Sequence, residues 1–194
     1  ANDYAALAEE QIKNDSSYMV LGAALSLLTE ADPKLARSYA KGLEKEKNNS
    51  IITTISALYA EVGTNEDHSF YTNNLTRVDG FGQIAFSANY AEYLVQDRPV
   101  RILNEATETF ETALSSTGGL WFINFSIARS FKKVQSHYQK EAAQLEKELM
   151  KMEEAGERDT AKQGELQRLK MALDNMSAAI ERIKNIEGLD RRVK

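Results

Sequence analysis

Apolar residues recur every three or four positions along most of this sequence, and few helix-breaking residues interrupt them. Only two prolines and ten glycines occur in 194 residues, and Ala, Leu, Glu and Lys are abundant. A sheet needs frequent Gly- and Pro-rich turns, whereas a period of about 3.6 residues is that of an amphipathic helix. The sequence therefore predicts an all-α fold.

The segment 14–46 has the pattern of a helical hairpin. Asp32 and Pro33 supply the N-cap and first-turn proline of its second helix, and the charged, Asn-rich EKEKNNS ends that helix. The apolar pattern of the first helix returns weakly after shifts of 33 residues, which place Tyr18 on Ile51 and then on Ile84.

These shifts predict three degenerate hairpins, over about 14–46, 47–78 and 79–114, each covering the apolar face of its neighbour. A chance alignment of ordinary amphipathic helices is the alternative. Gly118 and Gly119 should then break the chain before a buried helix that includes Leu120 to Ile127.

From about Val134 the pattern tightens into heptads on two helices, joined by EEAGERD around Gly156. The expected core positions are Val134, Tyr138, Leu145, Leu149 and Met152 on the first helix, and Leu166, Leu169, Leu173, Met176, Ile180 and Ile183 on the second. We therefore expect a HEAT-like superhelix of stacked hairpins over 1–133. A long antiparallel helical hairpin over 134–194 should pack on this body or project from it.

Composition excludes several classes of function. The net charge of -5 and the pI near 5.2 argue against nucleic-acid binding, which needs Lys and Arg massed on one surface. The absence of cysteine excludes disulfides and thiolate chemistry. No apolar run reaches the roughly 18 residues of a membrane span. Ala1 to Leu7 does not resemble a signal peptide, so a signal for export to the periplasm or beyond would lie outside this chain, and the compartment stays open.

Each of the two histidines has a carboxylate nearby in sequence. His68 follows Glu66 and Asp67, and His137 lies four residues before Glu141. A zinc site needs at least three protein ligands, and the two histidines fall in separate structural units. We therefore expect both to be surface residues and predict no metal site.

Two other patterns have structural explanations. GFGQIA, Gly80 to Ala85, matches the dinucleotide fingerprint G-x-G-x-x-A, but the polar segment before it is no buried strand, so a turn that opens a helix is expected. Six aromatic residues could line a ligand cleft, but their helical spacing favours the core: Phe81, Phe86, Tyr90, Tyr93, Trp121 and Phe122. No serine or carboxylate pair has a catalytic setting, so no catalytic residue is predicted.

DSSYMVLGAALSLLTEADP, from Asp15, and NNSIITTISALYAEVG, from Asn48, resemble the C-terminal HEAT-like helical region of bacterial zinc aminopeptidases of the aminopeptidase N type, the gluzincins. The resemblance covers about 14–128. It implies a non-catalytic accessory domain that walls the peptide chamber and restricts substrate access. Its partners would be the catalytic domain of the same polypeptide and the peptide substrate.

In that family an upstream domain holds zinc through H-E-x-x-H and a distant Glu, and a G-x-M-E-N element binds the substrate's amino terminus. None of these motifs occurs in this sequence, so no catalytic, metal or cofactor residue is carried over. This chain alone is therefore expected not to be an enzyme. The alternatives are a freestanding scaffold of tetratricopeptide or HEAT type and a chain that self-associates through its heptads, and the oligomeric state stays open.

Overall fold

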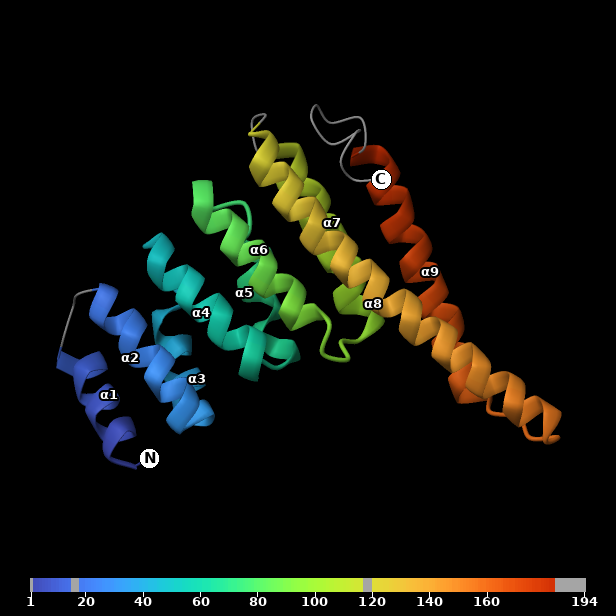
Figure 1. Cartoon of the computed structure of the whole chain (residues 1–194), viewed down its shortest axis with the longest axis horizontal. Helices are drawn as coiled ribbons and strands as arrows, with labels where there is room; N and C mark the ends of the chain where they lie inside the picture. Colours follow the sequence, from blue (N-terminus) through green and yellow to red (C-terminus); the bar gives the residue numbers. More distant parts are fainter. Residues whose placement is uncertain (1, 15–17, 117–119, 184–194) are drawn as a thin grey trace. The chain divides into compact units, whose positions relative to one another are not determined.

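The structure, a computed structural model, describes residues 2–14, 18–116 and 120–183. Over these ranges the chain is helical and has no strand, which confirms the all-α fold (Figure 1). The chain divides into two compact units, Ala1–Tyr93 and Leu94–Lys194. No helix in the described part is long and apolar enough to cross a membrane.

The first unit is built from short helices joined by tight turns. They are α1 (Asn2–Asn14), α2 (Tyr18–Ala31), α3 (Pro33–Leu43), α4 (Asn49–Val62), α5 (His68–Asn74), preceded by the 3-10 turn η1 (Asn65–Asp67), and α6 (Gly80–Leu94). Asp32 caps α3 as expected, because its carboxylate accepts a hydrogen bond from the Leu35 amide over 3.0 Å. Helices α2 and α4 pack side by side (Figure 1).

The hairpins repeat with a period of 31 residues, so the predicted period of 33 is wrong. Their first helices begin at Tyr18, Asn49 and Gly80. Three buried positions of each helix correspond at this spacing: Leu21, Ala24 and Leu28 in α2, Ile52, Ile55 and Tyr59 in α4, and Gln83, Phe86 and Tyr90 in α6. The shift of 33 aligned apolar residues of a general helical pattern, two positions out of register with these core residues.

The third predicted hairpin, over 79–114, also differs from the structure. Its two helices are present as α6 and α7 (Val100–Ser116), but they fall in different compact units. Helix α7 packs against α8 (Trp121–Glu154) and α9 (Thr160–Ile183), and these three helices form the core of the second unit. The two glycines predicted to break the chain before α8 lie outside the described residues.

Helices α8 and α9 form the predicted antiparallel hairpin (Figure 1). Gly156 lies in the connection with φ +77, a conformation that glycine adopts without steric cost. The expected domain boundary at 133/134 falls inside the continuous helix α8, whereas the compact units divide at 93/94. A strengthening of the heptads therefore marks the middle of a long helix and no break in the chain.

The core of the α8–α9 hairpin is uneven along its length. Near α7 the core positions Val134, Tyr138, Leu169 and Met176 are buried, together with alanines between them. Toward the connection, Leu145, Leu149, Met152 and Leu166 are only partly buried, because two helices without a third neighbour cannot cover each other fully. Leu173 is also only partly buried, contrary to the prediction.

Candidate functional site

The exposed sides of α2, α4 and α6 repeat at the same spacing of 31 residues as their buried sides. Four equivalent positions of each helix form what we call the first-helix face: Met19, Ala23, Ser26 and Glu30, then Ser50, Thr54, Ala57 and Glu61, then Phe81, Ala85, Ala88 and Glu92. All of these are exposed except Thr54, which is partly buried. Each row therefore has small side chains in the middle and a glutamate toward the C-terminal end of the helix.

A groove of about 160 Å³ lies between α2 and α4 on this face. The buried residues Leu25 and Leu58 line it, and Glu30 and Glu61 contribute carboxylates. At the opposite end of the rows, Met19 and Phe81 are 82% and 80% exposed. The face therefore offers acidic groups at one end and apolar side chains at the other, with a shallow surface of small residues between them.

The buried ionic centre of the first unit is Asp67, whose side chain is fully buried. Arg37 donates to both of its carboxylate oxygens, over 2.9 and 3.1 Å, and Lys41 lies 2.9 Å away. The Thr64 amide donates a further bond over 2.7 Å. Burial alone would raise the pKa of Asp67, but the hydrogen bonds from Arg37 and Lys41 lower it below its usual value. These groups tie α3 to the start of α5, which is a structural role.

His68 is buried, so its prediction as a surface residue is wrong. Its Nε2 atom lies 2.7 Å from the hydroxyl of Tyr90, and its ring stacks on Tyr93 at 6.3 Å between centroids. The Tyr93 hydroxyl donates to the Thr64 carbonyl oxygen over 2.7 Å. The apolar and aromatic residues that follow NEDH indicated a core position better than the neighbouring acidic residues indicated a surface.

The other aromatic residues divide between core and surface. Phe86, Tyr90 and Tyr93 are fully buried, as predicted, whereas Phe81 and Trp121 are exposed. The GFGQIA segment opens α6 with Gly80 at φ +51 and follows no strand in the described chain, so the predicted helix-opening turn is confirmed.

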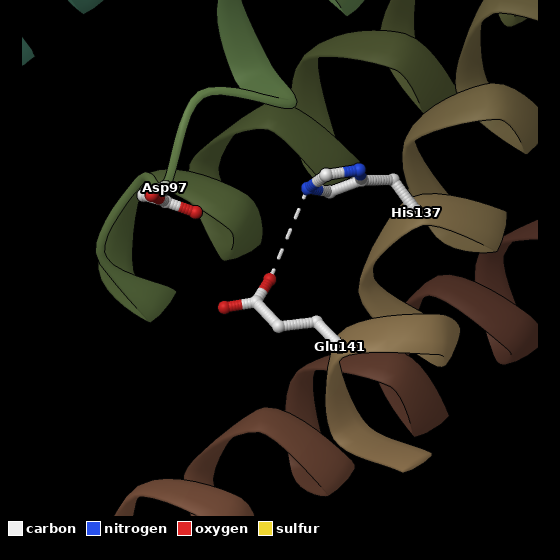
Figure 2. Close-up of side chains that lie close together, drawn as sticks. All are labelled: Asp97, His137 and Glu141. Atoms are coloured by element: carbon white, nitrogen blue, oxygen red, sulfur yellow. Dashed lines mark ion pairs between the residues drawn. The ribbon is translucent and has the colours of Figure 1, made fainter. Parts of the chain in front are cut away.

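In the second unit, Asp97, His137 and Glu141 lie together (Figure 2). Their ligand atoms all fall within 4.8 Å of one another, and the His137 Nε2 atom is 3.9 Å from the Glu141 Oε2 atom. Burial and the negative charge of Asp97 raise the pKa of Glu141. The spacing of His137 and Glu141 on one helix face was recognisable in the sequence, but the approach of Asp97 was not.

This cluster opens into a pocket of about 410 Å³. Its lining is mostly charged: Asp97, His137, Lys140, Glu141, Gln144, Leu145, Glu148 and Glu165. The opposite wall is supplied by α9, where Lys162 forms an ion pair with Glu148 over 3.1 Å. The two predicted histidines thus lie in different units, as expected, and only His137 lies beside a pocket.

The repeat pattern and this pocket raise the question of relatives. No family model, curated protein or solved structure matches this chain. The functional argument therefore rests on the chain's own surfaces.

Proposed function

We propose that this chain is a non-catalytic interaction module that binds a segment of another polypeptide on the first-helix face. The observation that carries the proposal is the repetition of four exposed positions at 31-residue spacing on α2, α4 and α6. The buried repeat follows from packing, but packing does not require exposed positions to recur. Stacked helical repeats present the kind of extended surface that binds peptides and protein segments.

The chemistry of the face specifies the segment. Glu30, Glu61 and Glu92 favour basic side chains at one end, and Met19 and Phe81 favour apolar ones at the other. The small residues between them allow a helix or an extended strand to approach closely. A segment with Lys or Arg at one end and apolar residues at the other fits this arrangement.

Selection from a displayed peptide library tests this proposal. Enriched peptides should combine basic and apolar residues. Reversing the three charges, with Glu30→Lys, Glu61→Lys and Glu92→Lys together, should weaken their binding by about tenfold or more, as measured by fluorescence anisotropy.

The matched control reverses three exposed glutamates near the α8–α9 connection, Glu153, Glu154 and Glu157, and so changes the net charge equally. Peptide affinity should then change less than about twofold. Equal loss in both triple variants would reduce the effect to net charge, and no loss in the first-helix variant would place binding elsewhere. Either result contradicts the proposal.

The more specific proposal is that the module is the C-terminal accessory domain of a zinc aminopeptidase and that the first-helix face walls its peptide chamber. Its support is the sequence resemblance over about 14–128. The reading frame upstream of Ala1 should then encode H-E-x-x-H and a distal Glu. Aminopeptidase turnover by the pure chain, stimulated by zinc, would contradict the non-catalytic role.

A further inference from the structure

The position of Asp97 is fixed by a side chain adjacent to His137. The Tyr138 hydroxyl donates a hydrogen bond to the Leu94 carbonyl oxygen over 2.6 Å and accepts one from the Arg98 amide over 3.0 Å. These bonds hold both sides of the turn that contains Asp97 against α8. His137 is the preceding residue on α8, and Glu141 lies one turn further along the helix, so all three side chains share one pocket (Figure 2).

The backbone of Asp97 is unusual. Its φ of +50 is the one positive value at a non-glycine residue in the described part of the chain. An L-residue in this conformation is disfavoured, and Asp and Asn tolerate it best among those with a side chain. This conformation belongs to the turn whose residue faces His137 and Glu141.

The separation of the three side chains suits an ion better than direct pairing. A hydrogen bond would bring the His137 and Glu141 atoms to about 2.9 Å, but they lie 3.9 Å apart. Two ligands bound to one tetrahedral zinc ion lie about 3.4 Å apart, since each is about 2.1 Å from the metal. The buried Oε2 atom of Glu141 has no hydrogen-bond partner within the described structure. Asp97 is exposed, so a small rotation brings its carboxylate into range.

We propose that Asp97, His137 and Glu141 bind one divalent transition-metal ion, with water in the remaining positions. One imidazole nitrogen and two carboxylates form a ligand set that suits Zn²⁺, Mn²⁺, Fe²⁺ or Co²⁺, and the imidazole disfavours Mg²⁺ and Ca²⁺, which prefer oxygen ligands. The adjoining pocket, about 410 Å³, has room for the waters. This site departs from the sequence prediction of no metal ligand, and it does not depend on the proposed peptide binding.

Calorimetric titration of the full chain without an affinity tag, after dialysis against a chelator, tests the site. Zn²⁺ and Mn²⁺ should each bind at one ion per chain, and Mg²⁺ and Ca²⁺ at least about tenfold more weakly. His137→Ala should abolish Zn²⁺ binding. Asp97→Asn keeps a residue that tolerates positive φ and should weaken binding about tenfold or more while leaving the melting temperature in place.

Glu153→Gln on the same helix is the matched control, because Glu153 is exposed and lies outside the pocket; it should leave metal affinity unchanged. Mn²⁺ should also broaden the NMR signals of residues 97, 137 and 141 selectively. Saturable binding that survives His137→Ala, no binding at millimolar metal, or equal affinity for Mg²⁺ and Mn²⁺ would each overturn the proposal.

Discussion

The hydroxyl of Tyr138 lies 2.6 Å from the carbonyl oxygen of Leu94, a residue 44 positions earlier in the chain. The same hydroxyl accepts a hydrogen bond from the Arg98 amide, so one side-chain oxygen partners two backbone groups of the turn before α7. Burial raises the pKa of Tyr138 to about 12, which keeps the hydroxyl protonated as a donor at neutral pH. The turn that carries Asp97 is therefore anchored to α8 by a single group.

Tyr138→Phe removes this anchor and leaves both backbone groups without their partner. We expect a loss of about 1 to 3 kcal/mol in the free energy of unfolding, measured by urea denaturation. The variant should also weaken Zn²⁺ binding, because Asp97 is no longer held opposite His137. Stability within about 0.3 kcal/mol of the wild type would show that the anchor contributes little.

Asp67→Asn removes the charge that Arg37 and Lys41 neutralise, and we expect a loss of about 3 kcal/mol at neutral pH. Because the folded-state pKa of Asp67 lies below its unfolded value, its contribution is present above about pH 4 and is lost as pH falls through the folded pKa. The difference between wild type and variant should shrink below about pH 4. Denaturation curves at pH 7 and pH 3 check this; a constant difference would contradict it.

Glu111→Gln serves as a comparison for this centre. Glu111 accepts two bonds from Arg182, over 2.5 and 2.8 Å, and these lower its pKa. Arg182 is exposed, so solvent screens the pair and the stability loss should be smaller than for Asp67→Asn.

Leu25→Ala and Leu173→Ala should differ in their effects, although the heptad and repeat patterns predicted equal burial. Leu25 is fully buried, and its truncation should cost about 2 to 5 kcal/mol. Leu173 is only partly buried, so its truncation should cost less than about 2 kcal/mol. Urea denaturation of both variants gives the comparison, and an equal or reversed order would contradict the assigned core.

Two glycine substitutions should act in opposite directions. Gly156→Ala places a side chain at φ +77 and should destabilise the chain by about 1 kcal/mol. Gly42→Ala lies in α3 with open space around the added carbon, and should stabilise by about 0.5 to 1 kcal/mol. Melting temperatures of the two variants test this, and two shifts of the same sign would count against the backbone assignment.

The periodicity of apolar residues predicted the helical class, the α3 cap at Asp32 and the hairpin connection at Gly156, because each depends on local chemistry. The spacing of the repeats was less accessible. Amphipathic helices align at several shifts, and only the observed burial of Leu28, Tyr59 and Tyr90 fixes the period at 31 residues. The domain boundary failed for a similar reason, since α8 changes its neighbours without a break in its helical pattern.

The candidate metal ligands show a second limit of sequence analysis. His137 and Glu141 stand one helical turn apart, a spacing recognisable in any helical segment. Asp97 joins them through a turn docked 40 residues earlier in the chain by Tyr138, which no local pattern encodes. For His68, the nearby acidic residues suggested solvent exposure, but Tyr90 and Tyr93 from α6 enclose it.

The central claim is that the first-helix face of α2, α4 and α6 is the binding surface of this chain. NMR titration of the ¹⁵N-labelled full chain with a peptide selected on it tests this most directly. We predict shift changes concentrated at the exposed positions of these three helices, including Glu30, Glu61 and Glu92. Changes confined to α8 and α9, with the first-helix face unaffected, would contradict the account.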